Sequence, residues 1–181
     1  MTTLGRRELL RLSAAALLCA PLSRVYAAKD SASNQVRTLS LVHTHVQESL
    51  TVDYYRDGAY VPEAIAKLNR LLRDFRTGEE HPIDPPLFDI LYDLHALTDR
   101  AGPFEIISCF RSPQTNAQLR DRSKAVAEHS LHMEGKAIDV RIRGFDTARL
   151  RDLALSMRRG GVGYYQKSDF VHVDTGRVRS W

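Results

Sequence analysis

Apolar and polar residues alternate along the stretch from Arg37 to Tyr55, and this pattern is typical of β-strands that bury one face. The polar tripeptide Gln47-Glu48-Ser49 interrupts the alternation, so we expect a hairpin of two strands joined there. From Pro62 to about Phe75 apolar residues recur every three or four positions, which predicts an amphipathic helix. Asp84 followed by Pro85 is a helix-start signal, and a second helix is expected to begin there.

The second half of the chain alternates between short strands and helices. In chain order the pattern predicts a buried strand Phe104–Phe110, a short helix around Thr115–Arg122 after Ser112-Pro113, a loop over 123–136, a strand Ala137–Arg143, a helix capped by Asp146 and running through Met157, and strands Val162–Tyr165 and Phe170–Asp174. No internal repeat or linker divides these elements. The expected fold is a small single α+β domain with a mostly antiparallel sheet flanked by helices.

The strand Ala137–Arg143 has the clearest alternation in the chain. Its apolar residues should point into the core: Ile138, Val140 and Ile142. The remaining residues share the opposite face, which should look onto a cleft or solvent: Ala137, Asp139, Arg141 and Arg143.

The first 27 residues have the pattern of an export signal. Arg6 and Arg7 precede an apolar run from Leu12 to Leu22, which is shorter than the roughly 20 residues that span a bilayer. Val25-Tyr26-Ala27 ends the segment with small residues where a signal peptidase reads them. The paired arginines, continued by Leu9-Leu10-Arg11, favour the twin-arginine route over an ordinary Sec signal. We therefore expect a periplasmic protein without stable membrane insertion after cleavage, organised as signal 1–27, flexible leader 28–36 and functional domain 37–181.

Removing this signal changes the charge of the chain. The sequence has 26 Lys+Arg and 22 Asp+Glu, but residues 1–27 hold four arginines and one glutamate, which leaves a formal charge of +1. A nearly neutral domain argues against a nucleic-acid partner. Beyond residue 27 the sequence has one cysteine, Cys109, so an internal disulfide is excluded and a core or a metal must hold the domain together.

Three polar residues have the spacing of a metal site. His132 lies in a predicted loop, Asp139 on the strand that follows it, and His172 in a later strand. Gly135 can supply the turn that folds this loop back toward the strand. Two imidazoles and a carboxylate suit Zn²⁺ and leave a fourth position for water, as in catalytic sites. From spacing alone, His172 could equally be a packed core residue, and Asp139 could pair with Arg141.

The residues around these positions resemble a known family. Ser130-x-His132-x-x-Gly135-x-Ala137-x-Asp139, followed by a histidine in a later strand, resembles the zinc D-Ala-D-Ala metallopeptidases, whose fold is shared with lysostaphin-type enzymes and the hedgehog domain. Further motifs narrow the resemblance to the YcbK-like (MepK) murein endopeptidases: Ser108-x-Phe110-Arg111-Ser112, Gly160-Gly161-Val162-Gly163-Tyr164-Tyr165, Phe170-Val171-His172-Val173-Asp174-Thr175-Gly176 and the terminal Trp181. The resemblance covers essentially the whole chain. It implies one zinc ion per chain, bound by His132, Asp139 and His172.

The resemblance also implies catalytic roles. A zinc ion would lower the pKa of a water toward about 7 and polarise the scissile carbonyl. Arg111 matches the family arginine that contacts a substrate carbonyl or carboxylate, where it could stabilise an oxyanion; a surface salt bridge is the alternative. Relatives in the wider superfamily place a glutamate three residues, or a histidine two residues, before the last zinc ligand, where this sequence has Asp169 and Phe170. Asp169 is the expected general base, and Asp174 is the alternative, either as base or as a residue that orients an imidazole.

The function that these residues imply is hydrolysis of peptide cross-links between peptidoglycan stem peptides during wall growth, by a monomeric enzyme. We expect the bond from D-Ala to meso-diaminopimelate as the first target and the diaminopimelate–diaminopimelate bond as the second. Two alternatives remain open. A non-catalytic zinc domain would bind wall peptides without cutting them, and a D-Ala-D-Ala carboxypeptidase would apply the same chemistry to a free terminus.

Overall fold

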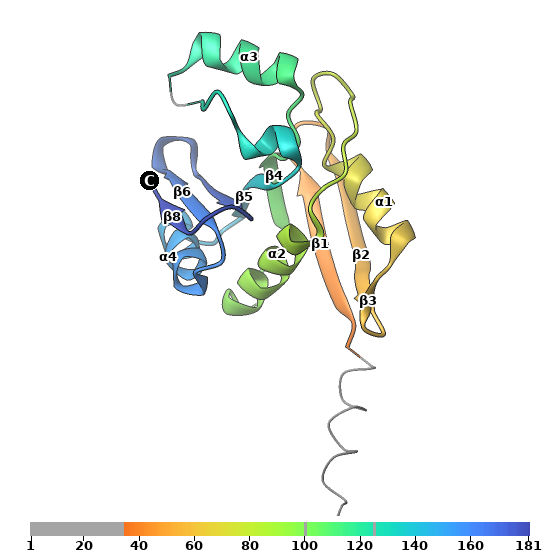
Figure 1. Ribbon diagram of the computed structural model, residues 1–181. Helices are drawn as coiled ribbons and strands as arrows, with labels where there is room; N and C mark the ends of the chain where they lie inside the picture. Colours follow the sequence, from red (N-terminus) through yellow and green to blue (C-terminus); the bar gives the residue numbers. More distant parts are fainter. Residues whose placement is uncertain (1–34, 100, 125) are drawn as a thin grey trace, which may run out of the picture.

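The computed structural model describes residues 35–99, 101–124 and 126–181, so the predicted signal over 1–27 lies outside the described residues (Figure 1). One sheet of eight strands runs through the domain in the order β3-β2-β1-β4-β5-β7-β6-β8. All neighbouring strands are antiparallel except the pairs β1–β4 and β6–β8, which confirms the predicted α+β fold with a mostly antiparallel sheet. The elements are β1 (Arg37–His43), β2 (Glu48–Arg56), β3 (Ala59–Tyr60), α1 (Pro62–Leu71), α2 (Pro85–Leu97), β4 (Phe104–Ser108), α3 (Pro113–Arg122), the 3-10 helix η2 (Leu131–Glu134), β5 (Ala137–Ile142), α4 (Thr147–Met157), β6 (Gly161–Tyr165), the 3-10 helix η3 (Gln166–Ser168), β7 (Phe170–Asp174) and β8 (Arg179–Ser180).

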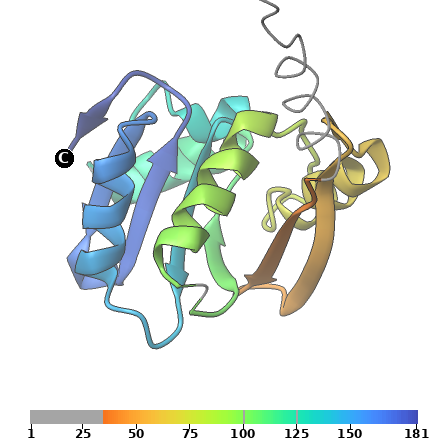
Figure 2. The same cartoon turned by 90° about the horizontal axis from the view of Figure 1, so that it is seen from below.

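The hydrophobic core lies between one face of this sheet and the helices α1, α2 and α4. Helix α1 packs on β2, α2 on β1, and α4 on β6 and β7, and Figure 2 shows α2 and α4 side by side over the sheet. The apolar residues of β5 point into this core as predicted, because Ile138 and Val140 are fully buried and Ile142 nearly so. Helix α3 stands apart from this layer in Figure 1. The opposite face of β5, β7 and β6 is therefore free to carry polar groups.

The first hairpin forms, but its turn is displaced from the predicted position. Strand β1 ends at His43 and β2 begins at Glu48, so the turn occupies 44–47 and not Gln47-Glu48-Ser49. Gln47 adopts a left-handed φ of 55°, and its N–H donates to the His43 carbonyl (2.9 Å). The chain therefore reverses before Glu48, and His45 lies in the turn.

Helix α1 is shorter than predicted, because it ends at Leu71 and not near Phe75. Beyond it, the fully buried carboxylate of Asp74 accepts hydrogen bonds from the backbone N–H (2.9 Å) and hydroxyl (2.7 Å) of Ser112. These bonds tie the chain after α1 to the start of α3. A helical continuation would break this connection.

The helix starts were predicted with mixed success. Ser112 caps α3 through Thr115, and Asp146 caps α4 by accepting a bond from the Arg149 N–H (2.7 Å). Asp84 does precede α2, but its carboxylate accepts from the Thr175 hydroxyl (2.6 Å) and makes no cap. The sequence prediction also missed the short elements β3, β8, η2 and η3.

Within the described ranges, every helix is too short or too polar to cross a membrane.

Candidate metal centre

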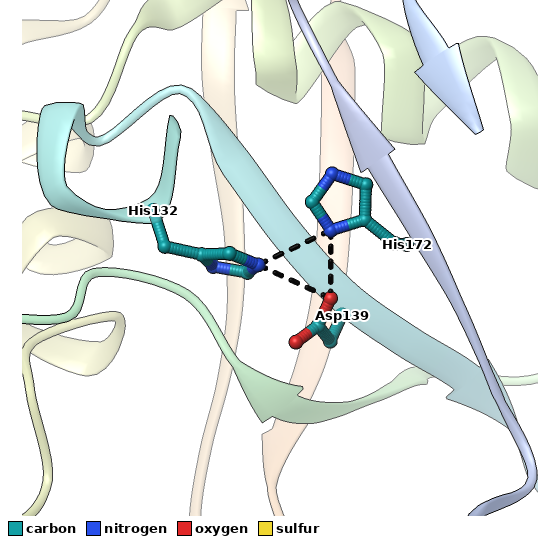
Figure 3. A group of neighbouring side chains, drawn as sticks. All are labelled: His132, Asp139 and His172. Atoms are coloured by element: carbon teal, nitrogen blue, oxygen red, sulfur yellow. Dashed lines mark hydrogen bonds and ion pairs between the residues drawn. The ribbon is translucent and has the colours of Figure 1, made fainter. Parts of the chain in front are cut away.

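Three buried side chains from three elements converge on the polar face of the sheet (Figure 3). Asp139 of β5 and His172 of β7 are direct cross-strand partners, so their side chains project side by side. His132 comes from η2, which must fold back over this face. Gly135 makes that possible: its φ is +65°, and a Cβ at this position would lie 2.3 Å from the Pro82 carbonyl oxygen. Only glycine fits such a turn without moving its neighbours.

The separations between the donor atoms fit a zinc ion. His172 Nδ1 lies 2.9 Å from Asp139 Oδ1, and His132 Nε2 lies 3.2 Å from both of these atoms. Tetrahedral ligands about 2.0–2.1 Å from zinc are themselves roughly 3.3 Å apart. Two imidazole nitrogens and one carboxylate oxygen are also the donor types that zinc prefers in catalytic sites.

The outer nitrogen of His132 is held by the protein backbone. His132 Nδ1 donates to the carbonyl oxygen of Cys109 over 2.6 Å, which leaves a lone pair on Nε2 directed at Asp139 and His172. Burial lowers the pKa of His132, and the charge of Asp139 offsets only part of this effect. The imidazole is therefore neutral at physiological pH, as a metal ligand must be.

Asp174 holds the imidazole of His172 through its outer nitrogen, Nε2. Its carboxylate accepts a hydrogen bond from His172 Nε2 (3.0 Å), which turns Nδ1 toward His132 and Asp139. Burial alone would lower the pKa of His172, but hydrogen bonds to Asp139 and Asp174 outweigh burial and raise it. Arg179 approaches the same carboxylate at 2.7 and 3.0 Å, and the N–H of Gly161 donates to it as well. This carboxylate–histidine pairing is a common support for zinc ligands.

Arg111 holds the carboxylate of Asp139. Its Nη2 donates to Asp139 Oδ2 over 2.5 Å and its Nε donates to the Ser108 hydroxyl over 2.9 Å, so Oδ1 remains for the two histidines. Burial would raise the pKa of Asp139, but His132, His172 and Arg111 hold it well below its usual range. The alternative pairing of Asp139 with Arg141 is not formed, since Arg141 binds Glu105 (2.8 Å).

The two candidates for the general base lie in different environments. Asp169 does not line the cleft: its side chain is 63% exposed, hydrogen-bonds Thr147 at the start of α4, and lies 3.7 Å from Arg141. Asp174 does belong to the centre, but its oxygens are occupied by His172, Arg179 and backbone N–H groups, which lower its pKa despite burial. Asp174 therefore lies beside His172 with its oxygens hydrogen-bonded, and Asp169 lies outside the cleft.

The three side chains lie at the floor of a cleft of about 470 Å³. On the β6–β7 side the wall is aromatic: Tyr165, Phe170 and Trp181. Another part of the wall is basic and polar, with His45 after β1, Arg76 after α1, and Ser108 and Arg111 at and after the end of β4. Asp139 is the one carboxylate residue among the described residues that line this cleft. Sequence reasoning did not assign Arg76, Arg179 or the Cys109 carbonyl to the site, because nothing in their local spacing relates them to the histidines.

A small α+β domain with a buried His-Asp-His group in an open cleft has the architecture of a metallopeptidase. Residues 31–181 match the peptidase family described as "Peptidoglycan L,D-endopeptidase MepK". The chain is 44% identical over 177 residues to proteins of that name from Escherichia coli (strain K12) and Shigella flexneri, covering 98% of this chain and 97% of each relative. It is 41% identical over 146 residues to a "Probable peptidoglycan L,D-endopeptidase MepK" from Haemophilus influenzae, covering 80% and 78%. The chain belongs to the MepK peptidase family, which confirms the resemblance found in its sequence.

Proposed function

We propose that this protein is a zinc-dependent peptidoglycan endopeptidase with His132, Asp139 and His172 as its metal ligands. The observation that carries the proposal is that each ligand has its own orienting partner: the Cys109 carbonyl, Arg111 and Asp174. When bound, zinc would supply the Lewis acidity that activates a water and polarises the scissile carbonyl. Family membership supports zinc dependence, and the open cleft above the ligands supports access for a peptide.

Arg111 is placed to do more than hold Asp139. Its Nε and Nη2 bind Ser108 and Asp139, so the Nη1 donors remain for a substrate oxygen in the cleft. A guanidinium fixed in this way can stabilise the negative charge that develops on the carbonyl oxygen. Since Asp139 is the one carboxylate residue among the described cleft residues, we infer that no carboxylate acts as a separate base.

The two candidate cross-links differ in stereochemistry at the bond that would be cut. An L,D bond has its carbonyl on an L centre and its nitrogen on a D centre. The diaminopimelate–diaminopimelate link has this configuration, whereas the D-Ala–diaminopimelate link joins two D centres. Because the relatives carry the name L,D-endopeptidase, we favour the diaminopimelate–diaminopimelate bond, which reverses the order expected from the sequence.

The test uses purified protein of known zinc content and defined muropeptide dimers of both cross-link types. Chromatography with mass spectrometry would detect monomers, and a His172→Ala variant and a chelated sample are the controls. We expect the diaminopimelate–diaminopimelate dimer to be cut by wild type alone. Stoichiometric zinc with binding but no turnover would establish the non-catalytic domain instead. Release of terminal D-Ala from monomeric pentapeptides would establish the carboxypeptidase.

We also propose export to the periplasm by the twin-arginine route, with cleavage after Ala27 and a monomeric mature protein. The paired Arg6 and Arg7 support the route, and the peptidoglycan substrate of the relatives supports the compartment. An Arg6→Lys/Arg7→Lys double variant should accumulate inside the cell at full length. Unchanged export of this variant would favour the Sec route.

A further inference from the structure

Arg76 presents a guanidinium to the cleft on the basic side of the metal centre. Its Cζ lies 4.1 Å from the centroid of the Phe75 ring, and that ring stacks in turn on His45 with centroids 4.1 Å apart and planes within 9°. Stacking covers the flat face of a guanidinium and leaves its edge, where the N–H donors lie, for a planar anion. The side chain is thus oriented by contacts that leave its hydrogen-bonding groups available.

One buried carboxylate positions the segments that carry Arg76 and Arg111. Asp74 Oδ1 accepts from the Arg76 backbone N–H (3.0 Å), while Asp74 Oδ2 accepts from the N–H and hydroxyl of Ser112 (2.9 and 2.7 Å). Ser112 directly follows Arg111 in the chain. The segments that carry the two arginines therefore share one support, and these hydrogen bonds to Asp74 come from backbone N–H groups and a hydroxyl.

The Arg76 side chain is exposed at the cleft, and the buried Asp74 is the carboxylate whose charge acts on it. Burial lowers the pKa of Arg76, as do the positive charges of Arg111 and Arg122, against the opposing effect of Asp74. Across residues 35–99, 101–124 and 126–181, no carboxylate forms an ion pair with this guanidinium, whereas Arg111 has Asp139. An exposed guanidinium that makes no ion pair among the described residues, and that lines a cleft in which Asp139 is the one carboxylate residue, is suited to bind an anionic group of a ligand.

We propose that Arg76 binds a carboxylate of the diaminopimelate residue next to the scissile bond and thereby selects cross-links with a free carboxylate. This inference rests on the proposed endopeptidase function. In both candidate cross-links, the diaminopimelate that supplies the scissile nitrogen keeps a carboxylate on that same D-centre carbon. A bidentate pair with a planar guanidinium would orient that residue, and converting the carboxylate to an amide would remove the charge.

The experiment compares each cross-linked dimer with its counterpart in which this carboxylate is amidated. For wild type we expect kcat/KM to be roughly ten- to hundredfold higher on the free acid, the range for a charged hydrogen bond. Arg76→Ala should lose that preference by slowing on the free acid alone, and Arg76→Lys should recover part of it. Arg56→Ala, an exposed arginine on β2 outside the cleft, is the matched control and should keep the full preference.

The outcomes separate this proposal from the proposed function. If wild type cuts neither form of any dimer, the endopeptidase itself fails and Arg76 has no substrate to select. If wild type cuts both forms equally, or Arg76→Ala slows both equally while circular dichroism shows a folded protein, the enzyme stands and the role of Arg76 is wrong. If the Arg76→Ala variant does not fold, Arg76→Lys provides the test instead. The proposal then requires that the ratio of kcat/KM on the free acid to kcat/KM on the amide differs between Arg76→Lys and wild type.

Discussion

The indole of Trp181, the last residue of the chain, lies against the imidazole of His172 with ring centroids 5.1 Å apart. The indole is held there by its N–H, which donates to the Tyr165 hydroxyl (3.1 Å), and by backbone bonds to Val162 and Tyr164. Trp181 is therefore part of the wall of the cleft that contains His132, Asp139 and His172. The fluorescence of an indole in this position should therefore respond to metal binding at the neighbouring histidine.

Metal binding should change the fluorescence of the protein directly. Trp181 is the single tryptophan in the sequence, so all tryptophan emission originates beside His172. Co²⁺ accepts the nitrogen and oxygen ligands that bind zinc, and its unpaired electrons quench nearby fluorophores. We expect stoichiometric Co²⁺ to quench the emission, excess zinc to restore it, and His132→Ala to abolish the effect. Tight Co²⁺ binding by dialysis without quenching would place the metal elsewhere.

Gly163→Ala should displace the indole. Gly163 is the cross-strand partner of His172, and a Cβ there would lie 2.6 Å from the Trp181 ring. Because the indole is half exposed, it can move aside, so we expect a red-shifted emission and a lower kcat/KM with little change in melting temperature. In a double-mutant cycle, Gly163→Ala should cause no further loss of kcat/KM when Trp181 is already replaced by alanine. Additive losses in that cycle would mean that Gly163 acts independently of Trp181.

Asp174→Asn should weaken zinc binding by about ten- to hundredfold, the usual effect of losing an outer partner of a metal ligand. The amide keeps the shape of the side chain but removes the charge that orients His172. Asp169→Asn is the matched control and should change neither zinc affinity nor turnover, because its carboxylate is directed to Thr147. Competition with a chromogenic chelator measures the affinity. Loss of turnover in Asp169→Asn with zinc retained would restore Asp169 as the general base.

The contrast between Asp139 and Asp169 explains what the sequence can predict here. Alternation along β5 places Asp139 on the polar face whatever the rest of the chain does, and antiparallel pairing then sets His172 beside it. The position of Asp169 depends instead on a turn. This residue has a left-handed φ of 53° after η3, and its carboxylate is directed to Thr147 and not to the cleft. Its spacing from His172 carried no information about that turn.

The basic wall of the cleft was also beyond prediction from spacing. Arg76 lines the cleft next to a segment that is anchored by the bond between Asp74 and Ser112, a contact between residues 38 positions apart. Helical periodicity made the region up to Phe75 look like a continuation of α1. A buried carboxylate that binds a distant backbone group has no local signal in one sequence. Such long-range polar contacts were left undetermined by the sequence, as were the short strands β3 and β8 and the position of the turn between β1 and β2.

His43 should make the stability of the fold depend on pH. It is almost fully buried at the end of β1, its Nδ1 accepts from the His45 N–H (3.3 Å), and Nε2 is buried with no hydrogen-bond partner among the described residues. Burial, with smaller contributions from His45 and Arg73, lowers its pKa from 6.5 to about 4. The unfolded chain therefore binds a proton that the folded protein rejects between these two values. The contribution of His43 to the free energy of unfolding is fully present above pH 6.5. It is lost as the pH falls toward 4, by up to roughly 3 kcal/mol.

The measurement is urea unfolding at a series of pH values for wild type and His43→Leu. Other groups titrate in the same range, so the difference between the two proteins is the quantity of interest. We expect the wild type to lose more unfolding free energy than His43→Leu between pH 6.5 and 4. His129→Leu, which replaces an exposed histidine of the cleft, is the control and should follow the wild type. Parallel curves for wild type and His43→Leu would mean that the imidazole of His43 stays accessible to protons in the folded state.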